Sequence, residues 1–305
     1  MSSVKPGYLK LLESGELERR ANKAWESLSC CKICPHLCGV NRLEGEQGFC
    51  KITDQAIVAS YGPHFGEEAP LVGRKGSGTV FFSWCNLRCL YCQNYEISHM
   101  GAGKAVSTDV LALCFLSLQK DGCHNINLVT PSHVVPFILK ALVMAARGGL
   151  SIPLVYNTGG YDSIRTLRLL EGVVDIYMPD FKYWDKDVGK HLSNIANYPH
   201  VAKKAIKEMH RQVGELIIGP DGVAKRGLLI RHLVLPGRLS DTRSVLKYIA
   251  EEISPNTYLN LMDQYRPCGE ARNYLPLDRR ITEYEFAEAL RAAKEVGLNR
   301  LDKRK

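Results

Sequence analysis

The chain has 305 residues, of which 45% are hydrophobic and 24% charged, values that are typical of a globular protein and exclude a disordered or fibrous one. Its 40 Lys and Arg residues against 32 Asp and Glu residues give a net charge of +8. This excess fits an anionic partner, but no nucleic-acid-binding motif accompanies it. No apolar run approaches the ~18 residues needed to span a bilayer, and residues 1–10 lack the apolar stretch of a secretory signal. We therefore expect a cytoplasmic protein with no nucleic-acid or membrane partner.

The elements follow one another in a regular order. Residues 14–28 carry apolar side chains at helical spacing and predict a helix, a cysteine-rich segment follows at 30–50, and residues 61–78, with seven Gly or Pro, predict a loop. From residue 79, short apolar runs alternate with amphipathic segments. The runs predict strands at 79–84, 126–130, 153–158, 173–181, 228–235 and 258–264, and the segments predict helices at 107–120, 133–147, 161–170, 198–214, 240–253 and 283–295.

This alternation predicts an α/β fold. The runs are nearly continuous in Val, Ile and Leu, as expected of strands buried on both faces. Six strand–helix units in series imply a parallel sheet with right-handed crossovers. Six units are too few for a closed eight-stranded barrel, but they can form a curved, open one.

Cysteine content is the unusual feature of the composition. Of 11 cysteines, eight fall between residues 30 and 92. In a reducing compartment, tight cysteine clusters more often bind metal than form disulfides.

The most informative cluster is Cys85-x3-Cys89-x2-Cys92, directly after the strand predicted at 79–84. In parallel α/β folds, functional residues gather at the carboxyl ends of strands. Three thiolates can hold three corners of an iron–sulfur cube and leave one iron open to an outside ligand. Two alternatives remain: a zinc site with His99 as fourth ligand, and a redox dithiol of Cys89 and Cys92 that leaves Cys85 unexplained.

This stretch, with the aromatic Tyr91 before the last cysteine, resembles the radical S-adenosylmethionine (SAM) superfamily. Within it the chain is most similar to proteins like the pyruvate formate-lyase activating enzyme, in the uncharacterised PflX-like branch. The matching segments are Gly66-Glu67-Glu68, Gly76-Ser77-Gly78-Thr79, Cys85-Asn86-Leu87-Arg88-Cys89 and Cys92-Gln93-Asn94. The resemblance extends from about Cys31 to the C-terminal strands.

The resemblance implies a partial (β/α)6 TIM-like barrel over residues 71–305, preceded by a cysteine-rich extension over residues 1–70. It implies an oxidoreductase that binds a 4Fe–4S cluster and SAM, and cleaves SAM reductively to a 5′-deoxyadenosyl radical that abstracts hydrogen. The implied substrate is a partner glycyl-radical enzyme or another peptide, and the implied electron donor is of the flavodoxin or ferredoxin type. The alternative function is a non-catalytic iron–sulfur protein that transfers electrons or senses oxygen.

SAM carries a carboxylate and an amine that need polar partners at the strand ends. Asp180-Phe181-Lys182 matches an Asp-x-Lys that contacts SAM in the activating enzyme, although a surface ion pair is the alternative. Asn157, in Asn157-Thr158-Gly159-Gly160, takes the place of an acid in that enzyme, and the alternative is a plain turn. Superfamily members often carry Gly-Gly-Glu after the second strand, where this chain has Thr130-Pro131-Ser132-His133, so we expect Ser132 or backbone carbonyls to receive the amine. Leu235 is a candidate to pack against adenine or is plain strand core.

A second cysteine cluster lies in the extension. Cys31, Cys34, Cys38 and Cys50 supply four thiols within twenty residues, a set that suits a closed zinc site or a second iron–sulfur cluster. Cys30 could replace Cys31 as a ligand. Cysteines that only pack a small subdomain are the alternative.

Overall fold

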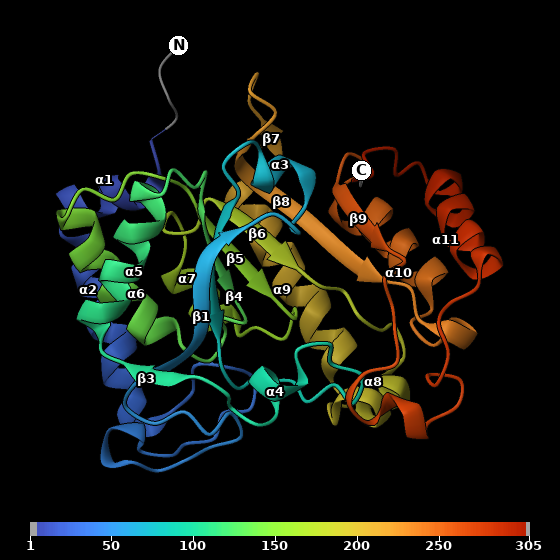
Figure 1. Cartoon of the computed structure of the whole chain (residues 1–305), viewed down its shortest axis with the longest axis horizontal. Coiled ribbons are helices and arrows are strands. Elements are labelled where there is room, and N and C mark those ends of the chain that lie inside the picture. The colour runs from blue at the N-terminus through green and yellow to red at the C-terminus, as the bar shows by residue number, and fades with distance from the viewer. Residues whose placement is uncertain (1–4, 303–305) are drawn as a thin grey trace.

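A computed structural model describes residues 5–302 of the chain. Its centre is a ladder of six parallel strands, each hydrogen-bonded to the next, and Figure 1 shows them crossing the middle of the molecule. In ladder order these are β2 (Ser77–Phe82), β4 (Ile126–Val129), β5 (Leu154–Thr158), β6 (Ile176–Pro179), β8 (Ala224–Leu233) and β9 (Tyr258–Met262). Among the described strands β2 and β9 do not pair, so the sheet stays open. The predicted α/β fold with a partial barrel is therefore confirmed.

Three strands that pair in antiparallel fashion extend this ladder, and two of them, β3 and β7, are short. β1 (Ala56–His64) pairs with β2, β3 (Lys104–Val106) pairs with the start of β1, and β7 (Ile217–Ile218) pairs with β8. The prediction of a loop over 61–78 is wrong, because β1, the short helix α3 (Ala69–Val72) and the start of β2 occupy much of it. Pro63 is tolerated in β1 because β3 pairs only with Ala56–Val58, which leaves Pro63 a single neighbouring strand.

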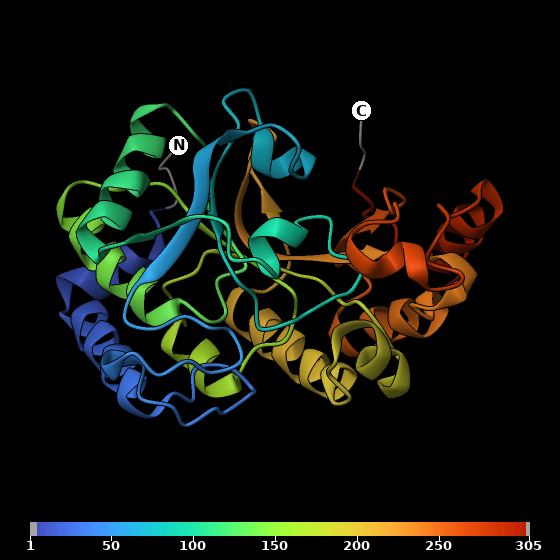
Figure 2. The same ribbon diagram turned by 60° about the horizontal axis from the view of Figure 1, so that its bottom comes forward.

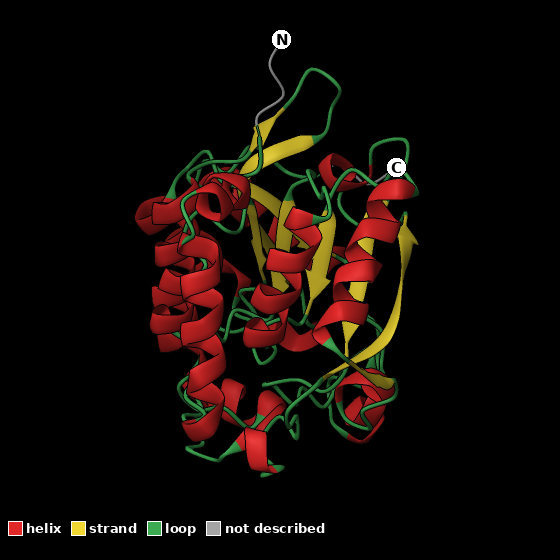
Figure 3. Ribbon diagram, turned by 90° about the vertical axis from the view of Figure 1, so that its left-hand side faces the viewer, coloured by secondary structure: helices red, strands yellow, loops and turns green. Residues whose placement is uncertain are grey.

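The helices cover the outer face of the sheet, as Figure 3 shows from one side. They are α1 (Gly7–Glu13), α2 (Glu16–Glu26), α5 (Thr108–Lys120), α6 (Val135–Arg147), α7 (Ile164–Leu169), α8 (Lys186–Ser193), α9 (Tyr198–Val213), α10 (Thr242–Tyr248) and α11 (Glu283–Glu295). The short helix α4 (Tyr95–Ser98) lies instead near the carboxyl ends of the strands (Figure 1). The helix predicted at 14–28 is present as α2 and the 3-10 turn at Ser27–Cys30, while α1 precedes it and was not predicted. Gly15, with a positive φ of 75°, separates α1 from α2. Ser107 caps α5 and a Thr282–Glu285 capping box starts α11.

The N-terminal extension and the barrel share one core. Leu17 of α2 and Ile52 of the extension belong to the same buried apolar cluster as Leu128 of β4 and Ile230 of β8. In Figure 2 the blue loop after α2 lies beside the yellow-green helix α7, and Thr166 of α7 donates a hydrogen bond to the Ile33 carbonyl of this loop. Within residues 5–302, no helix is both long and apolar enough to cross a membrane.

Candidate active site

The cysteine triplet lies at the carboxyl edge of the parallel strands. The loop that carries it leaves β2, and Trp84 begins it in a left-handed conformation (φ 63°) with its backbone N–H bound to the Ile97 carbonyl at 2.9 Å. Cys85, Cys89 and Cys92 are free thiols that line one cavity of ≈ 210 Å³. The remaining walls come from the ends of β4, β5, β6, β8 and β9. The fold thus brings the three cysteines together where a parallel sheet positions functional residues.

The fourth ligand distinguishes a zinc site from a cluster at this cavity. A closed zinc site needs four ligands around one ion. A 4Fe–4S cube offers a separate iron to each thiolate, so its ligands need not converge on one point. His99, the alternative fourth zinc ligand, stacks on Tyr95 at 4.2 Å and is not part of the cavity wall.

Each sulfur of the triplet has a hydrogen-bonding neighbour. These are Leu87 N at 3.3 Å from Cys85 Sγ, Ser193 Oγ at 3.0 Å from Cys89 Sγ, and Ser98 Oγ at 3.1 Å from Cys92 Sγ. Burial raises the pKa of the Cys85 and Cys92 thiols. Thiolates at these positions therefore need a positive partner, which the iron of a cluster would supply, while donors to the sulfurs tune its reduction potential.

A buried chain of hydroxyl groups supports Cys89. The Tyr183 hydroxyl donates to the Tyr91 hydroxyl at 2.6 Å and lies 2.8 Å from Ser193 Oγ, which contacts Cys89. Ser193 ends α8, and Leu90 N donates to the Leu192 carbonyl of the same helix at 2.9 Å. Neither α8 nor this support was predicted, because the contact joins residues about one hundred positions apart.

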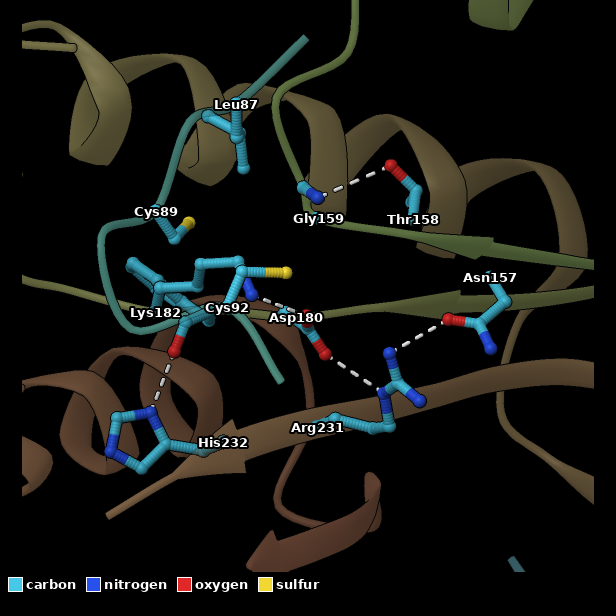
Figure 4. Close-up of polar contacts among 12 residues, drawn as sticks. Leu87, Cys89, Cys92, Asn157, Thr158, Gly159, Asp180, Lys182, Arg231 and His232 are labelled. Atoms are coloured by element: carbon cyan, nitrogen blue, oxygen red, sulfur yellow. Dashed lines mark hydrogen bonds and ion pairs between the residues drawn. The ribbon is translucent and has the colours of Figure 1, made fainter. Parts of the chain in front are cut away.

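Across the cavity from the cysteines lies a charged network, shown in Figure 4. Asp180 receives Lys182 Nζ at 2.6 Å on one oxygen and Arg231 Nε at 2.8 Å on the other, and Arg231 also donates to Asn157 Oδ1 at 2.7 Å. Burial disfavours the charged form of Asp180, but the attraction of Arg231 and Lys182 exceeds this effect, and the pKa of Asp180 is lowered. Burial also disfavours the charged form of Lys182, but the attraction of Asp180 and Cys89 exceeds this effect, and the pKa of Lys182 is raised.

This network can bind an anionic group. Among the residues that line the cavity, one carboxylate, Asp180, accompanies the two cations Lys182 and Arg231, and this excess favours a carboxylate or phosphate ligand. Buried Glu68, which is not part of the lining, also interacts with Arg231. Lys182 lies close enough to the cysteines to interact with Cys89. Gly159 completes the wall: a Cβ there would lie 2.6 Å from Leu87 Cδ1, so the backbone packs tightly against the cysteine loop.

Of the predicted strand-end residues, Asp180, Lys182 and Asn157 line the cavity, whereas Ser132 does not. The Ser132 hydroxyl is buried and lies 2.9 Å from Thr158 Oγ1. Leu235 faces a different cavity, and Leu233 lines this one instead. We missed the role of Arg231, although an Arg inside the apolar run of β8 is a signal that sequence reasoning could have used.

The extension cysteines also gather. Cys31, Cys34, Cys38 and Cys50 line one cavity of ≈ 10 Å³, while Cys30 is exposed and lies outside it. Burial raises the pKa of Cys34 and Cys50, and in each the neighbouring thiols add to the rise. The structure therefore groups the same four cysteines that sequence spacing singled out, with Cys31 rather than Cys30.

Two contacts join the two cysteine loops. His36 Nε2 lies 2.9 Å from the Asn86 carbonyl, and Arg88 donates to the Phe49 carbonyl at 2.9 Å. Arg88 also lies over the Phe49 ring at 5.0 Å. The extension therefore packs directly on the loop that carries Cys85 and Cys89.

Comparison with known proteins gives one clear relationship. No family model matches the chain. The chain is 31% identical over 298 residues to the uncharacterized protein MJ0674 of Methanocaldococcus jannaschii, and the match covers 95% of this chain and 82% of that protein. The chain therefore belongs to the same family as MJ0674.

Proposed function

We propose that this protein is a radical SAM enzyme, an oxidoreductase that holds a 4Fe–4S cluster at Cys85, Cys89 and Cys92. The observation that carries the proposal is one cavity lined both by these three cysteines and by the Asp180–Lys182–Arg231 network. Three thiolates leave one iron open, and the facing cations suit the carboxylate of an amino-acid-derived cosubstrate. The resemblance to the activating-enzyme family supports the same assignment.

Each residue has a distinct task in this proposal. Cys85, Cys89 and Cys92 would hold the cluster, which when bound would supply the electron that reductive cleavage of SAM requires. Lys182 and Arg231 neutralise the SAM carboxylate, Asp180 keeps both cations in place, and Asn157 orients Arg231. Apolar Leu233 and Met262 line the same cavity and help to exclude water from it.

The surface next to the cavity has room for a large substrate. A broad groove of ≈ 1020 Å³ adjoins the cavity, and Cys92, Gln93 and Asn94 line both. Arg266 and Arg272 line the groove as well. We infer that a peptide segment reaches the cavity through this groove. A glycine loop of a glycyl-radical enzyme is such a segment, and a flavodoxin- or ferredoxin-type protein is the electron donor.

The compartment follows from the cysteines. All 11 are free thiols, which suits a reducing compartment. We therefore propose that the protein acts in the cytoplasm.

The decisive experiment measures SAM cleavage. Anaerobically reconstituted protein reduced with dithionite should release 5′-deoxyadenosine from SAM, and Cys89→Ala should abolish the release. Cys114→Ala is the matched control, because Cys114 is a buried free thiol on α5 that lines none of the cysteine cavities. An intact cluster with no release would favour the electron-transfer or oxygen-sensing alternative, and full release by Cys89→Ala would refute the ligand assignment.

A further inference from the structure

The small cavity of the extension contains a buried cation as well as four thiols. Arg42 is 1% exposed and lines this cavity together with the four cysteines. The Arg42 side chain bonds to the Thr53 carbonyl at 3.1 Å and the His133 carbonyl at 2.9 Å, and its Nη1 lies 3.8 Å from Cys31 Sγ. It also lies 5.3 Å from the centre of the Phe137 ring. All of these neighbours are uncharged when Cys31 is a neutral thiol.

The positive charge of Arg42 lacks an anionic partner in the described chain. No carboxylate among residues 5–302 forms an ion pair with Arg42, and its Nη2 is buried without a hydrogen-bond partner. His133, another residue that lines this cavity, has a buried Nδ1 without a hydrogen-bond partner. An uncompensated buried charge costs several kcal/mol, so the site requires a negative group.

Metal–thiolate chemistry supplies that group. Four thiolates around one Zn²⁺ carry a net charge of −2, and four thiolates around a 4Fe–4S cluster in its +2 state carry the same charge. Either centre offers sulfur acceptors to a buried guanidinium. Neutral thiols would leave Arg42 unpaired, whereas a dianionic centre pairs it and suits four cysteines around one cavity.

We propose that Cys31, Cys34, Cys38 and Cys50 hold a second, dianionic metal–thiolate centre, and that Arg42 is its buried counter-ion. This inference does not rest on the proposed SAM chemistry, because its ligands belong to a separate loop and cavity. Arg42 acts as a positioning and charge-pairing residue rather than a metal ligand. The contacts of His36 with Asn86 and of Phe49 with Arg88 place this centre directly behind the first cysteine loop.

The test removes the ligands Cys85, Cys89 and Cys92 and measures whether the protein still binds metal. Full-length Cys85→Ala/Cys89→Ala/Cys92→Ala protein, reconstituted anaerobically with iron and sulfide or with Zn²⁺, should retain one centre per chain. Iron, acid-labile sulfide and zinc are measured in the same samples. Iron accompanied by an equal amount of sulfide identifies a cluster, and zinc without sulfide identifies a zinc site. Adding Cys34→Ser should abolish retention, and adding Cys30→Ser, the exposed neighbour, should leave it unchanged.

Arg42 is tested in the same background. Arg42→Met should weaken metal retention against a chelator by about 10- to 100-fold, the effect typical of losing a partner outside the metal ligands, and Arg42→Lys should restore part of it. Retention that Arg42→Met leaves unchanged would refute the counter-ion role. Triple-variant protein that is folded by circular dichroism but binds neither metal would refute the centre.

A measurement on the wild-type protein covers the case in which the triple variant does not fold. Alkylation of the native, metal-loaded protein followed by mass mapping should modify Cys30 and spare the four cavity cysteines. Removing metal with a chelator should expose Cys34 and Cys50 to alkylation. Equal labelling with and without metal would overturn the proposal.

Discussion

The charged network facing the cysteines makes a quantitative prediction for Asp180→Asn. Asp180 pairs with Lys182 at 2.6 Å and with Arg231 at 2.8 Å, and the three side chains are only 13–18% exposed. Removing one partner of a buried ion pair costs about 3–5 kcal/mol, and we take about 3 kcal/mol because some solvent reaches these groups. With about 2.1 cal/mol/K of unfolding entropy per residue, 305 residues give about 0.64 kcal/mol/K. The melting temperature should therefore fall by about 5 °C.

The assay is thermal unfolding of both proteins in the same metal-loaded state, with Glu251→Gln as control. Glu251 forms an exposed ion pair with Lys247 at 3.9 Å, so its removal should cost less than about 0.5 kcal/mol. The folded pKa of Asp180 lies below the ordinary 3.8, so its stabilising contribution is complete above pH 3.8 and is lost as the pH falls through the lower folded value. A melting temperature no lower than that of Glu251→Gln at pH 7 would refute the reasoning.

Three further predictions follow from single contacts. Ser193→Ala removes the hydroxyl beside Cys89 Sγ. The reduced cluster should then lose about 1 kcal/mol of preferential stabilisation, which lowers its one-electron potential by about 40 mV. Anaerobic redox titration measures this shift, and an unchanged potential would contradict the role of the contact. Lys182→Met should weaken SAM binding about tenfold or more, because a charge-assisted hydrogen bond contributes about 1.5–3 kcal/mol. Equilibrium dialysis without reductant measures the affinity, and an unaltered affinity would exclude Lys182 from the SAM site. Burial lowers the pKa of His232 to about 4. The stabilising contribution of the neutral imidazole is therefore complete above pH 6.5 and is lost as the pH falls towards 4. Chemical denaturation should show that stability declines less over this pH range in His232→Asn than in the wild type, and identical declines would refute this prediction.

The sequence predicts the ladder well because its signal is local. Most of the six parallel strands are short apolar runs buried on both faces, such as Leu154–Thr158, and such runs stand out from their neighbours. β1 escapes prediction because Gly62 and Pro63 resemble a loop, while its pairing with β2 depends on residues farther along the chain. Local composition does not reveal a partner strand that is distant in sequence and becomes a neighbour only in the folded protein.

The same limit applies to the sites. The spacing of Cys85, Cys89 and Cys92 is visible in the chain, but the Ser193 hydroxyl that contacts Cys89 and the Arg231 guanidinium that lines the cavity come from elements that follow much later. The choice between Cys30 and Cys31 is also conformational. Cys31 exchanges backbone hydrogen bonds with Gly39 and Val40 at 2.9 Å, and lines the cavity, whereas Cys30 ends a helical turn at the surface.

The long-range ties of the extension have a consequence for how the protein is made. The Ile33 carbonyl, within the cysteine loop of the extension, receives its hydrogen bond from Thr166, which is 133 residues later. At a translation rate of about 5–20 residues per second, this loop leaves the ribosome roughly 7–27 s before its docking surface exists. During that interval its four thiols are exposed on a nascent chain and open to oxidation or to the wrong ion. For the metal centre proposed in this loop, delivery of the metal would have to wait until the barrel that encloses the loop has been synthesised, or a delivery partner would have to take the place of the barrel until then.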